Sequence, residues 1–415
     1  MSGTISNVEA REILDSRATP TLECRVTLDD GTVGIASVPS GASVGKYEAH
    51  ELRDGDADWY GGKGVLKARD NITGEIRERI TGMKCDSQTA IDSALIALDG
   101  TKNKSRLGAN ATLAVSVAVA RAAAKHHSLE LFEYLGGKRA RGMPTPMMNI
   151  LNGGLHASNN LDIQEFMIVP ISAKNATRGV AICVDIYKKL REILLCEHLC
   201  VSVGDEGGFA PDLASDEDAL RLICRAIGEC GYSDSDVKIA IDAAASGWHS
   251  EGEYLLPKSK KKYTSEELGD YYVYLSEKYP LVSIEDGLGE EDYDGWHNLT
   301  ERLGGRIRLV GDDLFVTNAE RLRMGMDIGI ANSILVKPNQ IGTVSETLDV
   351  IALAQKGGYP HIISHRSGET SDSFIADLAV ATSAPFIKAG APARGERVAK
   401  YNRLTEIDGM LWKNE

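Results

Sequence analysis

Six short apolar segments between residues 239 and 390 each end on a charged or ionisable residue. The six end residues are Asp242, Glu285, Asp312, Lys337, His365 and Lys388. From Glu285 onward they lie 23 to 28 residues apart, which leaves room for one strand, one loop and one helix per step. Apolar strands that alternate with helices are typical of a parallel sheet, and a run of such units is most economically a closed β/α barrel.

Side chains at the carboxyl ends of barrel strands meet at one mouth of the barrel, where catalytic groups lie. A single acid after a strand is often only the cap of the next helix. Six strands that end on Asp, Glu, Asp, Lys, His and Lys are not explained by caps. We therefore interpret the six end residues as parts of an active site.

Length and charge limit the classes of protein that fit. The chain has 415 residues, of which 43% are apolar, enough for a barrel of about 250 residues and a smaller domain. Its net charge of −14 argues against nucleic acid or an anionic membrane as a partner. An anionic substrate would therefore need a local positive site or a metal ion.

The cysteines and the apolar runs predict a cytoplasmic protein. The seven cysteines show no CxxC spacing, which favours reduced thiols. No apolar run approaches the roughly 18 residues of a membrane span. Residues 1–15 are charged and lack the apolar core of a signal peptide.

A segment rich in glycine and proline at residues 136–146 predicts a domain boundary. We place a small α+β domain at residues 1–138 and the barrel domain at residues 139–415. The loop at residues 40–45 consists of small residues and is either a plain turn or a lid that closes over a ligand.

The first domain is predicted to begin with a meander of strands and to continue with helices. The strands are expected at residues 5–14, 21–28 and 32–38, with a hairpin turn at Asp29-Asp30-Gly31. The helices are expected at residues 64–81, 89–98 and 111–127. Asn110 is placed to cap the last helix.

Three further segments present polar groups before the series of six strands. A glycine turn carries His156. A segment of alternating polarity reads as a strand with Gln164 and Glu165 in its middle. An acidic turn between glycines carries Glu206. Each is compatible with a structural role, so their interpretation depends on the barrel mouth.

Three of the strand ends offer hard oxygen ligands. Asp242, Glu285 and Asp312 present carboxylates from separate strands, which suits Mg²⁺. Arg366 is a natural clamp for a phosphate or carboxylate group, and Ser367 adds a hydroxyl.

The remaining strand ends suggest a base. A lysine beside another cation and a metal, as expected for Lys337 near Lys388, has its pKa lowered and can act as a general base. A metal, a base and an anion clamp together indicate removal of a proton next to a carboxylate. Glu165 and Glu206 could then protonate a leaving hydroxyl and complete a β-elimination. A Schiff-base aldolase is the competing use of a barrel lysine, but it does not need a site of three carboxylates.

With these residues in place, the chain resembles the enolase family over nearly its whole length. The motifs that carry the resemblance are the glycine turn with His156, the strand with Gln164 and Glu165, Asp205-Glu206-Gly207-Gly208, Ile284-Glu285-Asp286, Gly311-Asp312-Asp313-Leu314, Asn339-Gln340-Ile341-Gly342-Thr343, the segment from Ser364 to Thr370 and Lys388-Ala389-Gly390. The use of a lysine base with Mg²⁺ is well known for this superfamily and comes with the resemblance.

The resemblance implies a fold and an activity. The fold is an enolase-like α/β barrel with partly antiparallel opening strands, preceded by a smaller α+β domain. The activity is the reversible dehydration of 2-phospho-D-glycerate to phosphoenolpyruvate by a homo-oligomer, dimeric or larger.

The resemblance also implies roles for residues. Asp242, Glu285 and Asp312 would bind one Mg²⁺, and Ser43 on the small-residue loop would ligate a second. Lys337 would remove the carbon-bound proton, and Glu206, oriented with Glu165, would help expel the hydroxyl. The residues expected to contact the small phosphorylated substrate are His156, Gln164, His365, Arg366, Ser367 and Lys388.

Five positions depart from the family pattern. Ala18 and Thr19 replace glycine and asparagine, Val44 replaces threonine, Gly247 replaces glutamate, and Pro338 replaces an apolar residue such as valine. These departures leave open a paralogue that acts on a phosphonate or another close analogue of 2-phosphoglycerate. A non-catalytic binding protein on the same fold usually lacks the base or a metal ligand, and here all are present.

Overall fold

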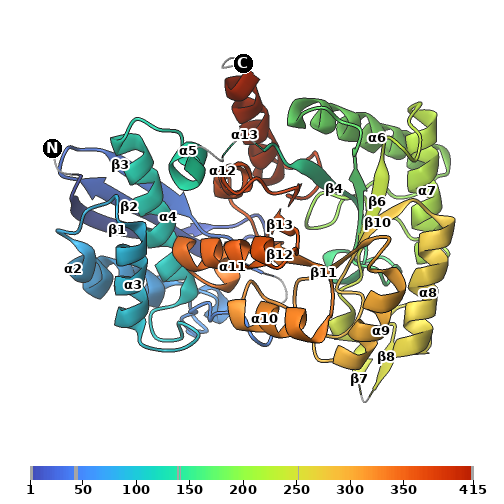
Figure 1. Cartoon of the computed structure of the whole chain (residues 1–415), viewed down its shortest axis with the longest axis horizontal. Helices are drawn as coiled ribbons and strands as arrows, with labels where there is room; N and C mark the ends of the chain where they lie inside the picture. Colours follow the sequence, from blue (N-terminus) through green and yellow to red (C-terminus); the bar gives the residue numbers. More distant parts are fainter. Residues whose placement is uncertain (1–2, 42–44, 138–139, 141, 251, 413–415) are drawn as a thin grey trace.

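The computed structural model describes residues 3–412 except 42–44, 138–139, 141 and 251. A smaller part made of strands and helices lies beside a closed barrel of eight strands (Figure 1). This arrangement confirms the predicted α/β barrel with a smaller N-terminal α+β domain. The division between residues 138 and 139 lies outside the described residues and stays a prediction.

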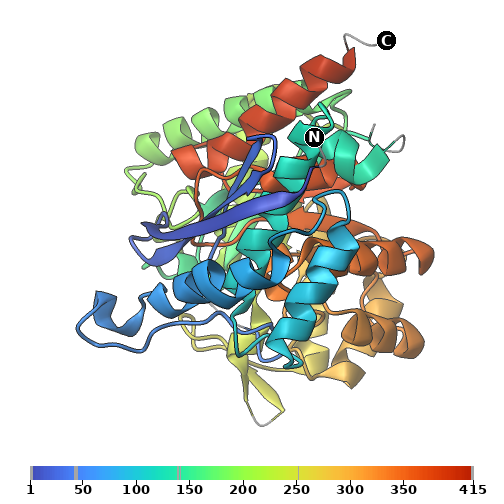
Figure 2. The ribbon, with the colours of Figure 1, turned by 90° about the vertical axis from the view of Figure 1, so that its left-hand side faces the viewer.

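The N-terminal part begins with a sheet of three antiparallel strands, which faces the viewer in Figure 2. The strands are β1 (Ile5–Leu14), β2 (Pro20–Leu28) and β3 (Val33–Ser37). Val8 pairs with Val26, and Cys24 pairs with Ala36, so one face of the sheet is apolar and buried. The predicted meander of strands is confirmed.

Helices cover the apolar face of this sheet. The helices that contact the strands are α1 (Leu66–Asn71), η2 (Ile72–Ile76), α2 (Arg77–Ile80) and α4 (Ala109–His126). The N-terminal part also contains η1 (Tyr60–Gly62), α3 (Gln88–Asp99) and α5 (Leu131–Gly136), of which α3 and α5 pack on α4. Gly34 of β3 allows α4 to pack closely, because a Cβ at this position would lie 2.0 Å from the carbonyl oxygen of Ala118. The prediction that Asn110 caps α4 is wrong, because Gly108 is the N-cap. The side-chain amide of Asn110 instead accepts a hydrogen bond from the backbone N–H of Leu52 and donates one to the carbonyl oxygen of Leu52.

The barrel closes in the order β10-β11-β12-β13-β14-β4-β5-β6. Its strands are β4 (Thr145–Asn152), β5 (Glu165–Val169), β6 (Lys238–Asp242), β10 (Leu281–Glu285), β11 (Arg308–Gly311), β12 (Ser333–Val336), β13 (His361–Ser364) and β14 (Phe386–Lys388). Among these, β5 alone runs antiparallel to both neighbours. The six predicted strands are therefore confirmed, as are the partly antiparallel opening strands that the resemblance implied.

The predicted alternation within the strand of Gln164 and Glu165 is wrong. Gln164 lies just before β5, and all five residues of β5 are buried. A barrel strand is covered on one side by the filled interior and on the other by helices, so neither side carries exposed polar residues.

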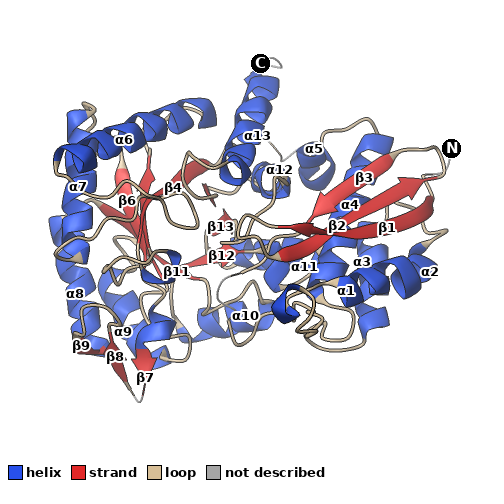
Figure 3. Cartoon of the chain, turned by 180° about the vertical axis from the view of Figure 1, so that it is seen from behind, coloured by secondary structure: helices blue, strands red, loops and turns tan. Residues whose placement is uncertain are grey.

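Helices surround the barrel, some on the side away from the N-terminal sheet and others against the helices of the N-terminal part (Figure 3). They are α6 (Ala176–Cys196), α7 (Asp216–Glu229), α8 (Ser265–Lys278), α9 (Tyr293–Leu303), α10 (Ala319–Ile328), α11 (Val344–Lys356), α12 (Phe374–Ala381) and α13 (Gly395–Trp412). A hairpin sheet of β7 (His249–Ser250), β8 (Glu253–Leu255) and β9 (Lys262–Thr264) projects beside α8. Among the described helices, none is both long and apolar enough to cross a membrane.

Buried polar contacts fix the N-terminal part on the barrel. Arg121 of α4 binds Asp372 with both terminal nitrogens, at 2.5 and 2.7 Å. Asp92 and Ser116 accept hydrogen bonds from the first backbone amides of α11. Ser40, at the start of the small-residue loop, pairs with Gly368 at the barrel mouth.

Two departures from the family pattern have a structural explanation. Pro338 is the first residue of the turn η6 (Pro338–Gln340), where its missing N–H costs no hydrogen bond. Gly247 lies exposed in η5 (Ala245–Trp248), and a Cβ there would meet no atom within 4 Å. Neither change disturbs the surrounding structure.

Ala18, by contrast, is strained. It has a φ of +55°, in the left-handed region that favours the glycine of the family pattern. Its turn is held by Asp15, whose Oδ1 accepts hydrogen bonds from the amides of Arg17 and Thr19.

Substitution Ala18→Gly should relieve this strain and raise the free energy of unfolding by about 0.5–1 kcal/mol, measured by urea unfolding. Ala57→Gly is the matched control, because Ala57 is exposed and its φ is not positive. That control should leave stability unchanged or lower it. Destabilisation by Ala18→Gly would contradict the strain.

Candidate active site at the mouth of the barrel

Four acids occupy the mouth of the barrel and are called the strand-end carboxylates below: Glu165, Asp242, Glu285 and Asp312. The first three lie level with one another, since Asp242 pairs in register with both Glu165 and Glu285. Glu165 begins its strand whereas Asp242 and Glu285 end theirs. Because β5 runs in the opposite direction, its first residue reaches the same mouth as the last residues of its neighbours.

Lys388, at the end of β14, reaches three of the strand-end carboxylates. Its buried ammonium lies 3.0 Å from Glu165, 3.2 Å from Asp242 and 2.8 Å from Glu285. Burial lowers the pKa of Lys388, but these three negative charges outweigh burial and raise the pKa well above its ordinary value. Lys388 is therefore a fixed positive charge.

Lys337 follows β12 and donates a hydrogen bond to Asp312, the fourth strand-end carboxylate. Burial, together with the cations Arg366 and Lys388, lowers the pKa of Lys337. The attraction of Asp312 exceeds these effects, so the pKa lies above its usual value. The predicted lowering of this pKa is therefore absent while Asp312 pairs with the lysine.

The strand-end carboxylates carry more charge than the two lysines neutralise. Fully ionised, four carboxylates against two ammonium groups leave two negative charges, and one negative charge remains when Glu165 is protonated. Burial and then the charge of Asp242 raise the pKa of Glu285 well above its usual range, which is the sign of incomplete compensation. A divalent cation would supply the missing charge, and oxygen donors are the ligands that Mg²⁺ prefers. The predicted ligands Asp242, Glu285 and Asp312 thus fit Mg²⁺.

A second group of acids lies near Asp312. Ligand oxygens of Asp286, Asp312 and Asp313 lie within 4.8 Å of one another. The two carboxylate oxygens of Asp286 already accept hydrogen bonds from the amides of Asp312 and Asp313, at 2.9 and 2.7 Å. Asp286 therefore holds the backbone that follows β11. Because both of its carboxylate oxygens are used in this way, Asp286 is less suited than Asp312 to bind a metal.

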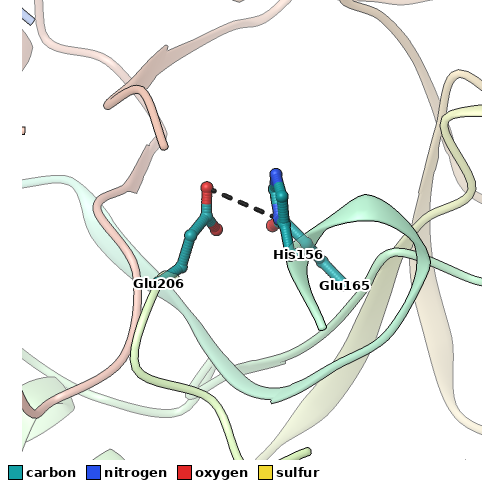
Figure 4. Close-up of side chains that lie close together, drawn as sticks. All are labelled: His156, Glu165 and Glu206. Atoms are coloured by element: carbon teal, nitrogen blue, oxygen red, sulfur yellow. Dashed lines mark ion pairs between the residues drawn. The ribbon is translucent and has the colours of Figure 1, made fainter. Parts of the chain in front are cut away.

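Across the mouth, Glu206 faces His156 and Glu165 (Figure 4). His156 ends the turn η4 (Gly154–His156), and its Nδ1 lies 3.5 Å from Glu165 and 3.7 Å from Glu206. Glu206 also accepts a hydrogen bond from Asn149 of β4 and lies 3.4 Å from Nε2 of His365. This arrangement joins the three polar segments that precede the six-strand series.

The two glutamates differ in their affinity for a proton. Burial raises the pKa of Glu165 well above its usual value, and the charge of Glu206 adds to this effect. Burial also opposes ionisation of Glu206, but the interaction with His365, whose Nε2 lies 3.4 Å away, outweighs burial and holds the pKa of Glu206 low. The pair is thus arranged to keep one proton, on Glu165, beside an ionised Glu206.

Arg366, which is predicted to bind an anionic group of the substrate, already binds a carboxylate of the protein. The guanidinium of Arg366 binds both carboxylate oxygens of Glu48, at 3.0 and 3.3 Å. Glu48 follows the small-residue loop of the N-terminal part, so this contact joins the two parts at the mouth. Gln164 and Ser367 line the same pocket, whereas Ser43 and Val44 lie outside the described residues.

Nearly all of the predicted residues that the structure describes come together in one pocket. Its empty volume is about 430 Å³, open solvent at the mouth included. Glu285 is not in the lining and contacts Lys388 at its edge. The lining residues that were predicted are His156, Gln164, Glu165, Glu206, Asp242, Asp312, Lys337, His365, Arg366, Ser367 and Lys388.

Sequence reasoning missed four residues that support the pocket. Asp286 stands next to Glu285, and that adjacency was an available signal. Asn149, Glu48 and Arg397 lie outside the patterns considered, and only the fold brings them to the site.

If the strand-end carboxylates bind Mg²⁺, excess MgCl₂ should raise the melting temperature, because a ligand that binds only the folded state stabilises it. The variant Glu285→Gln should lose most of this rise in thermal unfolding. Glu301→Gln, on the exposed face of α9, is the matched control and should keep it. An equal rise in Glu285→Gln would contradict the assigned metal site.

Two protein-family models match the chain. The model described as "Enolase, C-terminal TIM barrel domain" matches residues 140–414. The model described as "Enolase, N-terminal domain" matches residues 5–135. The matched ranges contain all of the predicted site residues.

Proposed function

The chain belongs to the enolase family of lyases, and on that premise we propose that it dehydrates 2-phospho-D-glycerate to phosphoenolpyruvate, reversibly and with Mg²⁺. The observation that carries this proposal is the placement of a lysine and a pair of glutamates in one pocket. Lys337 can take a proton there, and Glu165 with Glu206 can give one.

In the proposed reaction, the C2 proton moves to Nζ of Lys337. The electron pair of that C–H bond forms the C2=C3 double bond, and the C3 hydroxyl leaves with a proton as water. Asp242, Glu285 and Asp312 would hold one Mg²⁺, and Ser43 a second. When bound, Mg²⁺ stabilises the negative charge that develops on the substrate carboxylate.

Lys337 can act as a base only in its neutral form. Its burial beside Arg366 and Lys388 favours that form, and its hydrogen bond to Asp312 opposes it. Engagement of Asp312 by another cation would weaken this opposition and lower the pKa of Lys337. The structure thus supports a base that becomes active when Asp312 exchanges its partner.

The glutamate pair is suited to expel the hydroxyl. Glu165 keeps a proton because its pKa is raised, and His156 lies close to both carboxyl groups. General acid catalysis of this kind contributes about 10²–10⁴-fold to rate. We propose that the proton of this pair goes to the leaving hydroxyl. Glu206 is the member of the pair that lies next to His365.

Positive and polar groups of the pocket are suited to the phosphorylated substrate. Arg366 is oriented by Glu48, while Ser367 and Gln164 line the same pocket. Lys388 keeps its charge and can attract the substrate carboxylate.

The alternatives have less support. Of the departures that the structure describes, Ala18, Thr19, Gly247 and Pro338 do not line the pocket, so they give no reason to prefer a phosphonate substrate. A non-catalytic binding protein would not need the retained acid and base.

Location and assembly remain proposals. All seven cysteines are free, in keeping with the proposed cytoplasmic location. A homo-oligomer, dimeric or larger, is inferred from the family.

The direct test is ultraviolet detection of the conjugated product from 2-phosphoglycerate. We expect fast turnover that requires Mg²⁺. Absence of turnover by folded protein that binds Mg²⁺ would contradict the proposal, and phosphonate analogues would then be assayed.

Lys337→Ala should lower kcat by roughly 10²–10⁴-fold, because the general base is lost. The rise in melting temperature with MgCl₂ should persist. Lys356→Ala, at the exposed end of α11, is the matched control and should turn over normally. Undiminished turnover in Lys337→Ala would exclude Lys337 as the base.

A further inference from the structure

A buried arginine of α13 lies directly behind the active site. Arg397 is 0% exposed and is among the largest fully buried side chains of the protein. One terminal nitrogen, Nη1, lies 2.7 Å from Nδ1 of His365 and 2.6 Å from the carbonyl oxygen of Arg366. The other, Nη2, donates to the carbonyl oxygens of Ser367 and Asp205, at 2.5 and 3.1 Å.

These contacts determine which nitrogen of His365 carries its proton. A guanidinium has only N–H donors and stays charged in proteins, so a ring nitrogen at hydrogen-bond distance from it must accept. Nδ1 of His365 is therefore the acceptor, and the proton of the neutral ring is on Nε2. That nitrogen lies 3.4 Å from Oε2 of Glu206.

We propose that Arg397 is a positioning residue that holds His365 in the Nε2–H tautomer, so that the ring presents a hydrogen-bond donor, and not an acceptor, to the ionised carboxylate of Glu206. This inference rests on the proposed function. It adds to that function a reason why Glu206 stays ionised, so that the one proton of the glutamate pair stays on Glu165 and is available to the leaving hydroxyl.

The charged groups around His365 agree with a neutral ring. Burial lowers the pKa of His365 to about 4, and the positive charge of Arg397 acts in the same direction. Glu206 and Glu369 face the ring as well and oppose the lowering. At neutral pH the ring is therefore uncharged, and its tautomer decides what it can do.

Arg397 also joins the two segments that carry Glu206 and His365. Its contact with Asp205 holds the turn of Glu206, and its contacts with Arg366 and Ser367 hold the loop of His365. If Arg397 had only a structural role, its contacts with these carbonyl oxygens would be sufficient. The tautomer of His365 is therefore the property that distinguishes a positioning role from a structural one.

The first measurement is the ¹⁵N NMR spectrum of the whole protein with labelled histidine, without substrate, with the His365 signals identified by their loss in His365→Gln. We expect the Nε2–H tautomer, unprotonated down to about pH 5. An Nδ1–H tautomer or an imidazolium at neutral pH would overturn the proposal. Because no turnover is involved, this result is independent of the proposed reaction.

The second measurement uses Arg397→Met, which removes the donors. We expect a mixture of His365 tautomers, a pKa of His365 closer to the ordinary histidine value, and a kcat lower by at least roughly tenfold with little change in KM. Arg397→Lys, which keeps a cationic donor, should restore part of the kcat. A pure Nε2–H tautomer with normal kcat in Arg397→Met would overturn the proposal.

Arg394→Met is the matched control. Arg394 also binds a carbonyl of the acidic turn, that of Gly204, and the carbonyl of Ser16, but it makes no hydrogen bond to His365. This variant should leave the tautomer unchanged. If Arg397→Met fails to fold, the tautomers of the wild type and of Arg397→Lys decide the question.

Discussion

The strand-end carboxylates and the two lysines among them form the interaction on which the site depends. Buried charges are costly unless they are paired, and here two ammonium groups pair with four carboxylates. The remaining negative charge fits the proposed divalent cation. The same pairing raises the pKa of Lys337, so in the proposed reaction the activation of this base depends on Asp312 taking another partner.

The fold supplies this arrangement through one unusual strand. Since β5 is antiparallel to its neighbours, its first residue, Glu165, lies level with Asp242. The N-terminal part then covers the mouth, because Glu48 reaches Arg366 and Ser40 pairs with Gly368. The strained turn at Ala18 belongs to the same contact region.

Much of the fold and site could be predicted because the strand ends repeat in the sequence. Asp242, Glu285 and their successors come from one local pattern, an apolar run followed by an ionisable residue. Arg397 could not be found this way, since it contacts His365 across 32 residues of chain and lies inside a helix, away from the strand ends. The raised pKa of Lys337 was also missed, because it depends on the distance to Asp312, which no spacing in the sequence reveals.

In the proposed reaction Lys337 acts as the base and the glutamate pair as the acid. Exchange of the C2 proton tests these separate roles most directly. The variant Glu206→Gln would be incubated with 2-phosphoglycerate and Mg²⁺ in deuterated water, and deuterium at C2 followed by NMR. Continued exchange without formation of phosphoenolpyruvate is the predicted result, since removal of the proton would persist while expulsion of the hydroxyl is blocked. Loss of exchange together with product formation would contradict these separate roles.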